Sequence, residues 1–330
     1  MRKTYRIYSL LIDSAFELLG HNESVATSAP DYKILQSSEA IPYPDETSES
    51  ALRKPWSVAS PALYYLDIDD ICTFLVRPEG TISIYMYPES SPEHMLPFLY
   101  DTIFSVALAY KDIFTLKASA VQRKSDGQAQ LFCAMNNGGK STLSTVLMHN
   151  GYKFISDDRV LLRWDNNQER YLAQCIDPKV ELWRTVSRDF MKGPAAKQKL
   201  LSHSHVVRPG LLKNYFHVSE EVQLREAIPV SDCFLITLMN DDEPTSATEV
   251  SGLAKVRTML RHVHKHDLIA HLGKSQQEYA FLSKLCQQLN MLAINRAENA
   301  PFIDFVHLVV EKMGTDMSAV EKARDERTVE

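Results

Sequence analysis

The segment AMNNGGKST, residues 134–142, combines residue types that bind phosphate groups. Its two adjacent glycines give a backbone whose N–H groups can approach an anion closely. The lysine that follows can bridge terminal phosphate oxygens, and the next serine carries the hydroxyl that such loops place on Mg²⁺. The candidate phosphate-binding residues are Asn136, Asn137, Gly138, Gly139, Lys140, Ser141 and Thr142, with Lys140 also a candidate catalytic residue.

The segment departs from the pattern G-x-x-x-x-G-K-[ST] at its first position, where Ala134 stands. Alanine has the smallest Cβ, so the loop can still close. The apolar run QLFCAM precedes the loop and predicts a strand, and STLSTVLMHN predicts a helix that ends before Gly151. The residues of the loop also fit a second interpretation, a small-residue turn from strand to helix in an α/β core.

Two adjacent carboxylates follow at the end of another predicted strand, in FISDDRVLL. Magnesium prefers carboxylate and phosphate oxygens, and a kinase needs a carboxylate that orients and deprotonates the acceptor hydroxyl. Asp157 and Asp158 can divide these two tasks beside a phosphate loop. A surface Asp-Asp turn is the alternative, but the order strand, loop, helix, aspartate pair favours a functional site.

The segments TLKASAV, QLFCAMNNGGKSTL and GYKFISDDRVLL together resemble the core of the HPr kinase/phosphorylase superfamily. That core has a strand with a His-Ala/Gly pair, a short hairpin, a phosphate loop and an Asp-Asp strand. The later segment IDPKVELWR resembles a Pro-x-x-x-Leu-Trp stretch of related proteins from peptide-modifying clusters. Among these, the chain is most similar to lasso-peptide kinases, which phosphorylate a C-terminal serine of a precursor peptide. The strong part of the resemblance covers residues 112–185.

The resemblance implies a set of roles. Asp157 is the expected base toward a serine hydroxyl, while Ser141 and Asp158 are the expected Mg²⁺ ligands beside ATP. Lys117 stands where the family has the histidine of its His-Ala pair, which puts a reverse, phosphorylase activity in doubt. Thr142 stands where HPr kinases have a glutamate, as in the related peptide kinases. HVVRPGLL resembles the family's Arg-Pro-Gly loop. The possible contacts to substrate or phosphate are Lys117 and Arg208.

We therefore expect an α/β fold with an HPr kinase-like P-loop core, a mixed sheet with flanking helices, preceded by a smaller β-rich region. The predicted division is residues 1–100 for the β-rich region and 101–330 for the kinase domain with its helical C-terminal part. The expected function is ATP-dependent phosphorylation of a peptide serine, in the maturation of a lasso or similar ribosomal precursor peptide. The alternatives are a non-catalytic ATP-sensing module and a small-molecule, carboxykinase-like kinase.

Composition and net charge limit the other classes of function that the chain can have. The net charge of −6 argues against nonspecific nucleic-acid binding. No apolar run reaches the length of a membrane span, and the N-terminus has no pattern of a signal peptide. Five scattered cysteines predict reduced thiols, so we expect a cytoplasmic protein. The expected partner is a peptide substrate, with neither nucleic acid nor membrane, and self-assembly into a homo-oligomer is left open.

The remaining patterns predict elements that must carry the site. TYRIYSL predicts a strand, CTFLVR-PEG-TISIYMY predicts a hairpin, and residues 92–110 predict a helix. Residues 36–54 predict a loop, and residues 253–313 predict amphipathic helices joined by short loops. The histidines at 262, 264, 266 and 271 predict an exposed polar helix face rather than a metal site, and Trp183 is expected in the core.

Overall fold

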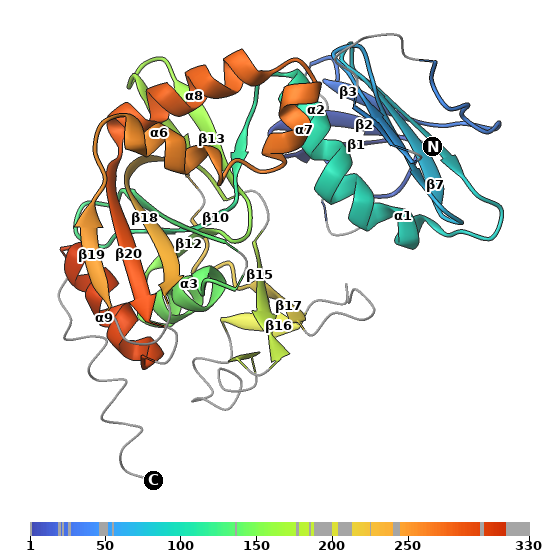
Figure 1. Ribbon diagram of the computed structural model, residues 1–330. Helices are drawn as coiled ribbons and strands as arrows, with labels where there is room; N and C mark the ends of the chain where they lie inside the picture. The colour runs from blue at the N-terminus through green and yellow to red at the C-terminus, as the bar shows by residue number, and fades with distance from the viewer. Residues whose placement is uncertain are drawn as a thin grey trace. The chain divides into compact units, whose positions relative to one another are not determined.

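The protein is a mixed α/β molecule that divides into two compact units (Figure 1). Unit 1 comprises Met1–Phe114 and Val263–Phe281, and unit 2 comprises Thr115–His262 and Leu282–Glu330. The predicted boundary near residue 100 falls inside a helical stretch that belongs wholly to unit 1. This computed structural model describes residues 2–18, 21, 23–25, 28–45, 52–54, 56–135, 137–175, 178–184, 186–187, 200–203, 213–224, 226–239, 245–297 and 300–314.

Unit 1 is built on an eight-stranded sheet with the strand order β1-β2-β3-β8-β7-β6-β5-β4. The sheet is mixed, because β3 runs parallel to both β2 and β8 and the other neighbours are antiparallel. The strands are β1 (Lys3–Ile7), β2 (Leu10–Ser14), β3 (Tyr32–Gln36), β4 (Leu52–Lys54), β5 (Ser57–Ala59), β6 (Tyr64–Ile68), β7 (Cys72–Arg77) and β8 (Thr81–Met86).

The local predictions for this unit are only partly confirmed. The hairpin between β7 and β8 is confirmed, and Gly80 adopts a φ of 107° in its turn. The predicted strand TYRIYSL is wrong as a single element, because Tyr8 and Ser9 have positive φ values of 49° and 73° and turn the chain between β1 and β2. The segment predicted as a loop at 36–54 ends in β4.

The helix predicted over residues 92–110 is confirmed, and it packs on the sheet of unit 1. It consists of α1 (Pro92–Phe98), a π-helical turn η1 (Leu99–Ile103) and α2 (Phe104–Tyr110). All seven residues of α2 are buried, and the Tyr32 hydroxyl of β3 donates to the Ala107 carbonyl at 3.3 Å. Unit 1 also contains α7 (His266–His271) and the first half of α8 (Ser275–Gln288).

Unit 2 contains a nine-stranded mixed sheet around three parallel strands, because β11 and β20 both pair in parallel with β18. The carboxyl ends of parallel strands lie at one edge of a sheet, so the last residues of these three strands, Ala134, Met239 and Ala297, lie at the same edge. The strands are β9 (Thr115–Leu116), β10 (Ala118–Gln122), β11 (Ala129–Ala134), β12 (Lys153–Ser156), β13 (Val160–Asp165), β14 (Arg170–Ala173), β18 (Ile228–Met239), β19 (Ser246–Glu249) and β20 (Asn290–Ala297).

The prediction of helices throughout residues 253–313 is wrong at β20. This segment pairs with β18 over eight residues and with β19 on its other side. A segment of eight residues is too short for its apolar spacing to separate a strand from a short helix. Only the two neighbouring strands, which are distant in sequence, decide that NMLAINRA is extended.

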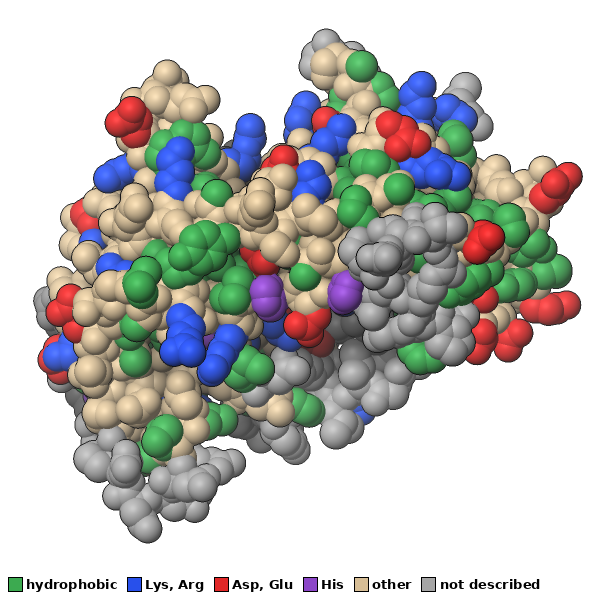
Figure 2. Space-filling view, turned by 45° about the horizontal axis from the view of Figure 1, so that its top comes forward, with side chains coloured by type: hydrophobic (Ala, Val, Ile, Leu, Met, Phe, Trp, Pro, Cys, Tyr) green, Lys and Arg blue, Asp and Glu red, His purple; other side chains and the backbone are tan. Residues whose placement is uncertain are grey.

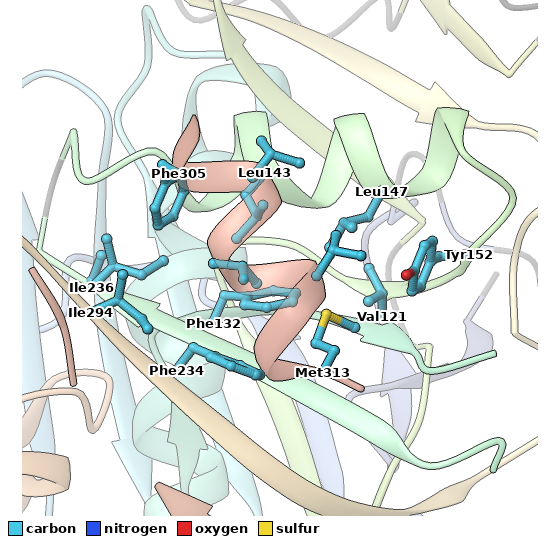
Figure 3. Close-up of a cluster of buried hydrophobic side chains, with 14 residues drawn as sticks. Val121, Phe132, Leu143, Leu147, Tyr152, Phe234, Ile236, Ile294, Phe305 and Met313 are labelled. Carbon is cyan, nitrogen blue, oxygen red and sulfur yellow. The ribbon is translucent and has the colours of Figure 1, made fainter. Parts of the chain in front are cut away.

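Helices cover both faces of the unit 2 sheet. On one face, α3 (Lys140–His149) and α9 (Phe302–Lys312) pack around the stacked rings of Phe132 and Phe234, whose centroids are 5.6 Å apart (Figure 3). Residues of opposite parity on the same strands point to the other face, where the Cys233 thiol lies 3.7 Å from the Met259 sulfur of α6 (Leu253–Leu260). This two-sided cover explains why β11 is buried at every position.

A third, antiparallel sheet of unit 2 packs against α3 and β12 through a separate apolar cluster. Its strands are β15 (Lys179–Trp183), β16 (Leu201–His203) and β17 (Lys213–Val218). In β15, Val180 and Leu182 point into this cluster. Because side chains alternate along a strand, Trp183 points to the opposite side, and 37% of its surface is exposed. The expectation that Trp183 lies in the core is therefore wrong.

The described residues show a mixed surface charge. Figure 2 shows both basic and acidic side chains on the face that it presents. Within the described part of the chain, no helix is long and apolar enough to cross a membrane. Cys72, Cys133, Cys233 and Cys286 are buried free thiols, and Cys175 is partly exposed.

Candidate functional site

The segment 135–139 connects β11 to α3 at the edge where the parallel strands end. Two of its residues have left-handed backbone conformations, Asn137 with a φ of 68° and Gly139 with a φ of 88°. Gly139 is the N-cap of α3, and no side chain of a described residue caps the helix N-terminus. The first N–H groups of this ten-residue helix and its dipole can therefore bind an anion. Asn136 lies outside the described residues.

The structure gives a physical account of Ala134. Its φ is not positive, so the backbone of β11 does not need glycine at this position. The loop instead needs glycine at 138, where a Cβ would lie 2.5 Å from the Cβ of Ala134 and 3.2 Å from the Met135 carbonyl oxygen. The departure from the first glycine of the pattern is thus compatible with a tightly folded loop.

Lys140 is buried, with 7% of its surface exposed, and its ammonium donates to the carbonyls of Ala134 at 3.0 Å and Met135 at 3.4 Å. Burial lowers the pKa of this ammonium, while the carboxylates of Asp157 and Asp158 act in the opposite direction. The two acidic residues predicted from sequence therefore face the loop lysine. An ammonium has three N–H donors, so Lys140 keeps donor capacity beyond the two carbonyls.

Asp157 accepts hydrogen bonds from two strands. The Ser119 hydroxyl of β10 donates to its Oδ1, and the Glu181 backbone N–H of β15 donates to its Oδ2 at 3.2 Å. Ser141 of α3 lies near enough to lower the pKa of the carboxyl. Asp157 is partly buried, and this desolvation raises the pKa of its carboxyl against the effect of the hydrogen bonds. A fixed carboxylate with a raised pKa is suited to accept a proton.

Asp158 completes the oxygen donors of the site. It adopts a φ of 63° directly after Asp157, and its side chain is exposed. The carboxylates of Asp157 and Asp158 and the hydroxyl of Ser141 are hard ligands, which Mg²⁺ prefers. Within the described residues no three acidic, histidine or cysteine side chains form a metal cluster. Two carboxylates and a hydroxyl suit the way Mg²⁺ binds together with substrate phosphates, without a complete protein cage.

Lys117 lies beside the same site. It separates β9 from β10, two residues before Ser119, and its charge lowers the pKa of the Lys140 ammonium. No ion pair or hydrogen bond joins its ammonium to another described residue. Lys117 is therefore placed where it can neutralise phosphate charge. Arg208 lies outside the described residues, and Thr142 is the third residue of α3.

Sequence patterns did not identify Arg296, which the fold brings to the loop. It lies in the parallel segment of β20, paired with Leu238 of β18, and its Nη1 lies 3.3 Å from the position that a Cβ on Gly139 would occupy. The guanidinium stacks over the rings of Phe302 and Phe305, at 4.8 and 5.6 Å from their centroids. Only the pairing of β20 with β18 reveals this position, because no local motif marks Arg296.

The predicted exposed histidine face is wrong. His264 contacts the Asp101 carboxylate at 3.1 Å and His266 contacts Glu278 at 2.9 Å, both within unit 1. His262 is buried in unit 2, and its carbonyl accepts a hydrogen bond of 2.7 Å from the Lys117 backbone N–H. The three histidines follow α6 in turns or begin the short α7, so they share no helix face.

Comparisons with known proteins give little further guidance. No family model and no curated protein matches the chain. Among solved structures, the chain is similar to the Hpr(Ser) kinase/phosphatase from Coxiella burnetii, with 13% sequence identity and a TM-score of 0.30. The match covers 65% of this chain and 98% of that chain. Because the two structures superpose poorly, a functional conclusion must come from the geometry of this site.

Proposed function

We propose that this protein is an ATP-dependent kinase that phosphorylates a serine hydroxyl on a peptide. The observation that carries the proposal is the position of Asp157, which accepts hydrogen bonds from Ser119 and the Glu181 N–H and lies near the charge of Lys140. A partly buried carboxylate, a loop lysine and a helix N-terminus are parts that phosphoryl transfer uses.

Each part has a distinct task. Bound ATP and Mg²⁺ supply the phosphoryl group and the divalent charge that neutralises its oxygens. The backbone N–H groups of the loop and of α3, together with Lys140, bind phosphate oxygens. Ser141 and Asp158 hold the metal ion. Asp157 accepts the proton of the serine hydroxyl, and its raised pKa makes it a stronger base than an exposed aspartate.

The choice of a peptide substrate is the narrower part of the proposal. It is supported by the resemblance of the segment IDPKVELWR to HPr-kinase-related proteins from peptide-modifying clusters. On this basis the acceptor is the C-terminal serine of a lasso or similar ribosomal precursor peptide.

Arg296 lies beside the loop and adds a cation to that of Lys140 for binding phosphate groups. Its guanidinium can form paired hydrogen bonds that a lysine cannot.

The test incubates the full chain with ATP, Mg²⁺ and precursor peptides that end in serine, followed by mass spectrometry. We expect one or more phosphate additions on the serine and none on a peptide with alanine in its place. Asp157→Asn should lower the transfer rate by about 10²- to 10⁴-fold, the usual contribution of a positioned base. Asp112→Asn is the matched control, because Asp112 is an exposed carboxylate in unit 1.

Other results would indicate a different function for this protein. ATP binding without any transfer, unchanged in Asp157→Asn, would indicate a nucleotide sensor. Phosphorylation of a small molecule in the absence of any peptide would indicate a carboxykinase-like enzyme. Full transfer activity in Asp157→Asn would remove the proposed role of the base while leaving a kinase.

A further inference from the structure

The residue His262 is largely buried, but its ring has no hydrogen-bond partner in the described part of the chain. Only 7% of the surface of the residue is exposed. No hydrogen bond joins either ring nitrogen to another described residue, and neither nitrogen is among the fully buried side-chain atoms that lack a partner. The ring nitrogens therefore keep access to solvent, so a molecule bound beside the ring can contact them.

The position of His262 indicates which ligand that is. Its carbonyl is bonded to the backbone N–H of Lys117 at 2.7 Å, and two residues further on Ser119 donates to the Asp157 carboxylate. Two residues span at most about 7 Å of chain, so His262 is anchored close to the proposed base. The charge of Lys140 acts on the imidazole as well, which places the ring on the side of the phosphate loop.

The charge state of the ring suits hydrogen bonding rather than charge pairing. Burial lowers the pKa of His262 to about 4, and the positive charges of Lys140 and Arg261 act in the same direction. At neutral pH the imidazole is uncharged, with one N–H donor and one acceptor nitrogen. A neutral donor adds a hydrogen bond to a site that already contains several cations, without adding another repulsive charge.

We propose that the His262 imidazole donates a hydrogen bond to the terminal phosphoryl group of the nucleotide bound by the loop at 135–139. This inference rests on the proposed function, because that function supplies the nucleotide. It assigns His262 to the binding site beside Lys140 and Lys117, although it lies 122 residues after Lys140 in the sequence. Nucleotide binding then gives a partner to an imidazole to which no described residue is hydrogen-bonded.

The experiment compares two substitutions of the same residue. His262→Leu keeps apolar bulk and removes both nitrogens, whereas His262→Gln keeps an N–H donor. We expect His262→Leu to weaken binding of a non-hydrolysable ATP analogue about tenfold, the loss of one hydrogen bond in a buried site. His262→Gln should recover most of that loss. Thermal unfolding of each variant without nucleotide shows that the fold is retained, and His94→Leu, at an exposed histidine of α1, is the control.

A spectroscopic measurement separates a ligand contact from a structural role. The imidazole ¹⁵N resonances of His262 are assigned by their loss in His262→Gln. At fixed neutral pH they should shift when the ATP analogue binds and shift less with the corresponding ADP complex, which lacks the terminal phosphoryl. If they respond equally to both, or to neither, the proposal is overturned.

The outcomes distinguish this inference from the proposed function. If wild type and His262→Leu phosphorylate the peptide and bind the analogue equally well, His262 has no role in binding and the kinase stands. If the resonances shift with the analogue but no peptide is phosphorylated, His262 contacts phosphate and the peptide-kinase proposal fails. If the wild type does not bind the analogue, both proposals fail.

Discussion

The contact between Ala134 and Gly138 offers a sharp test of the loop geometry. A Cβ added at Gly138 would lie 2.5 Å from the Cβ of Ala134, whereas real Cβ atoms essentially never approach closer than 3.0 Å. The backbone of Gly138 has no positive φ, so alanine meets a steric obstacle there and no conformational one. Gly138→Ala must therefore push the loop away from the end of β11 by about 0.5 Å or more.

The magnitude follows from the cost of overpacking a buried site, about 1–3 kcal/mol. For a protein region of 150–250 residues this lowers the melting temperature by about 2–4 °C per kcal/mol. Ala134→Gly removes the opposing methyl and alone should cost about 0.5–1 kcal/mol, because glycine weakens a strand. In the double variant the clash is gone, so its stability should lie close to that of Ala134→Gly.

The assay is a double-mutant cycle, with free energies of unfolding from urea titration of the four proteins. We expect Gly138→Ala and Ala134→Gly to be non-additive by about 1–3 kcal/mol in favour of the double variant. Gly139→Ala is the matched control, since its Cβ would meet Phe302 and Arg296 and Ala134→Gly should not rescue it. Additive effects at 134 and 138 would show that the loop is not folded against the strand end in this way.

Three further predictions concern the core, the base and the cation beside the loop. Phe132→Ala should lower the free energy of unfolding by about 3–5 kcal/mol, because its buried ring stacks on another ring between α3 and α9, and urea titration checks this. Asp157→Asn should be more stable than wild type at alkaline pH, because a raised pKa means that ionisation of the wild-type carboxyl opposes folding. That advantage should shrink as the pH falls and the wild-type carboxyl takes up its proton; a constant difference in melting temperature across the pH range would contradict it. Arg296→Gln should weaken ATP binding by at least tenfold, as calorimetry can measure, because a charge-assisted hydrogen bond contributes about 1.5–3 kcal/mol. Unchanged affinity would place Arg296 outside the phosphate site.

The sequence determined the local parts of the candidate site. Glycines, a lysine and a serine in fixed order between an apolar strand and a helix predicted the loop and α3, and both are observed. The hairpin of unit 1 and the helix at 92–110 were equally local, since turn residues and helical spacing specify them. Asp157 and Asp158 could be proposed from sequence because they end a strand close after the loop.

Tertiary structure decided everything that depends on segments far apart in the chain. The strand β20 forms only because β18 and β19 flank it, and this pairing brings Arg296 beside Gly139. His262 reaches the loop lysine through a backbone contact with Lys117, at a sequence distance that no periodicity covers. Burial and charge also became visible only there, because the pKa of a side chain depends on neighbours that the fold assembles. Residues that belong to one turn or one helix can be recognised from their spacing along the chain. Residues that come from separate strands are brought together by packing, so their spacing in the sequence does not reveal them.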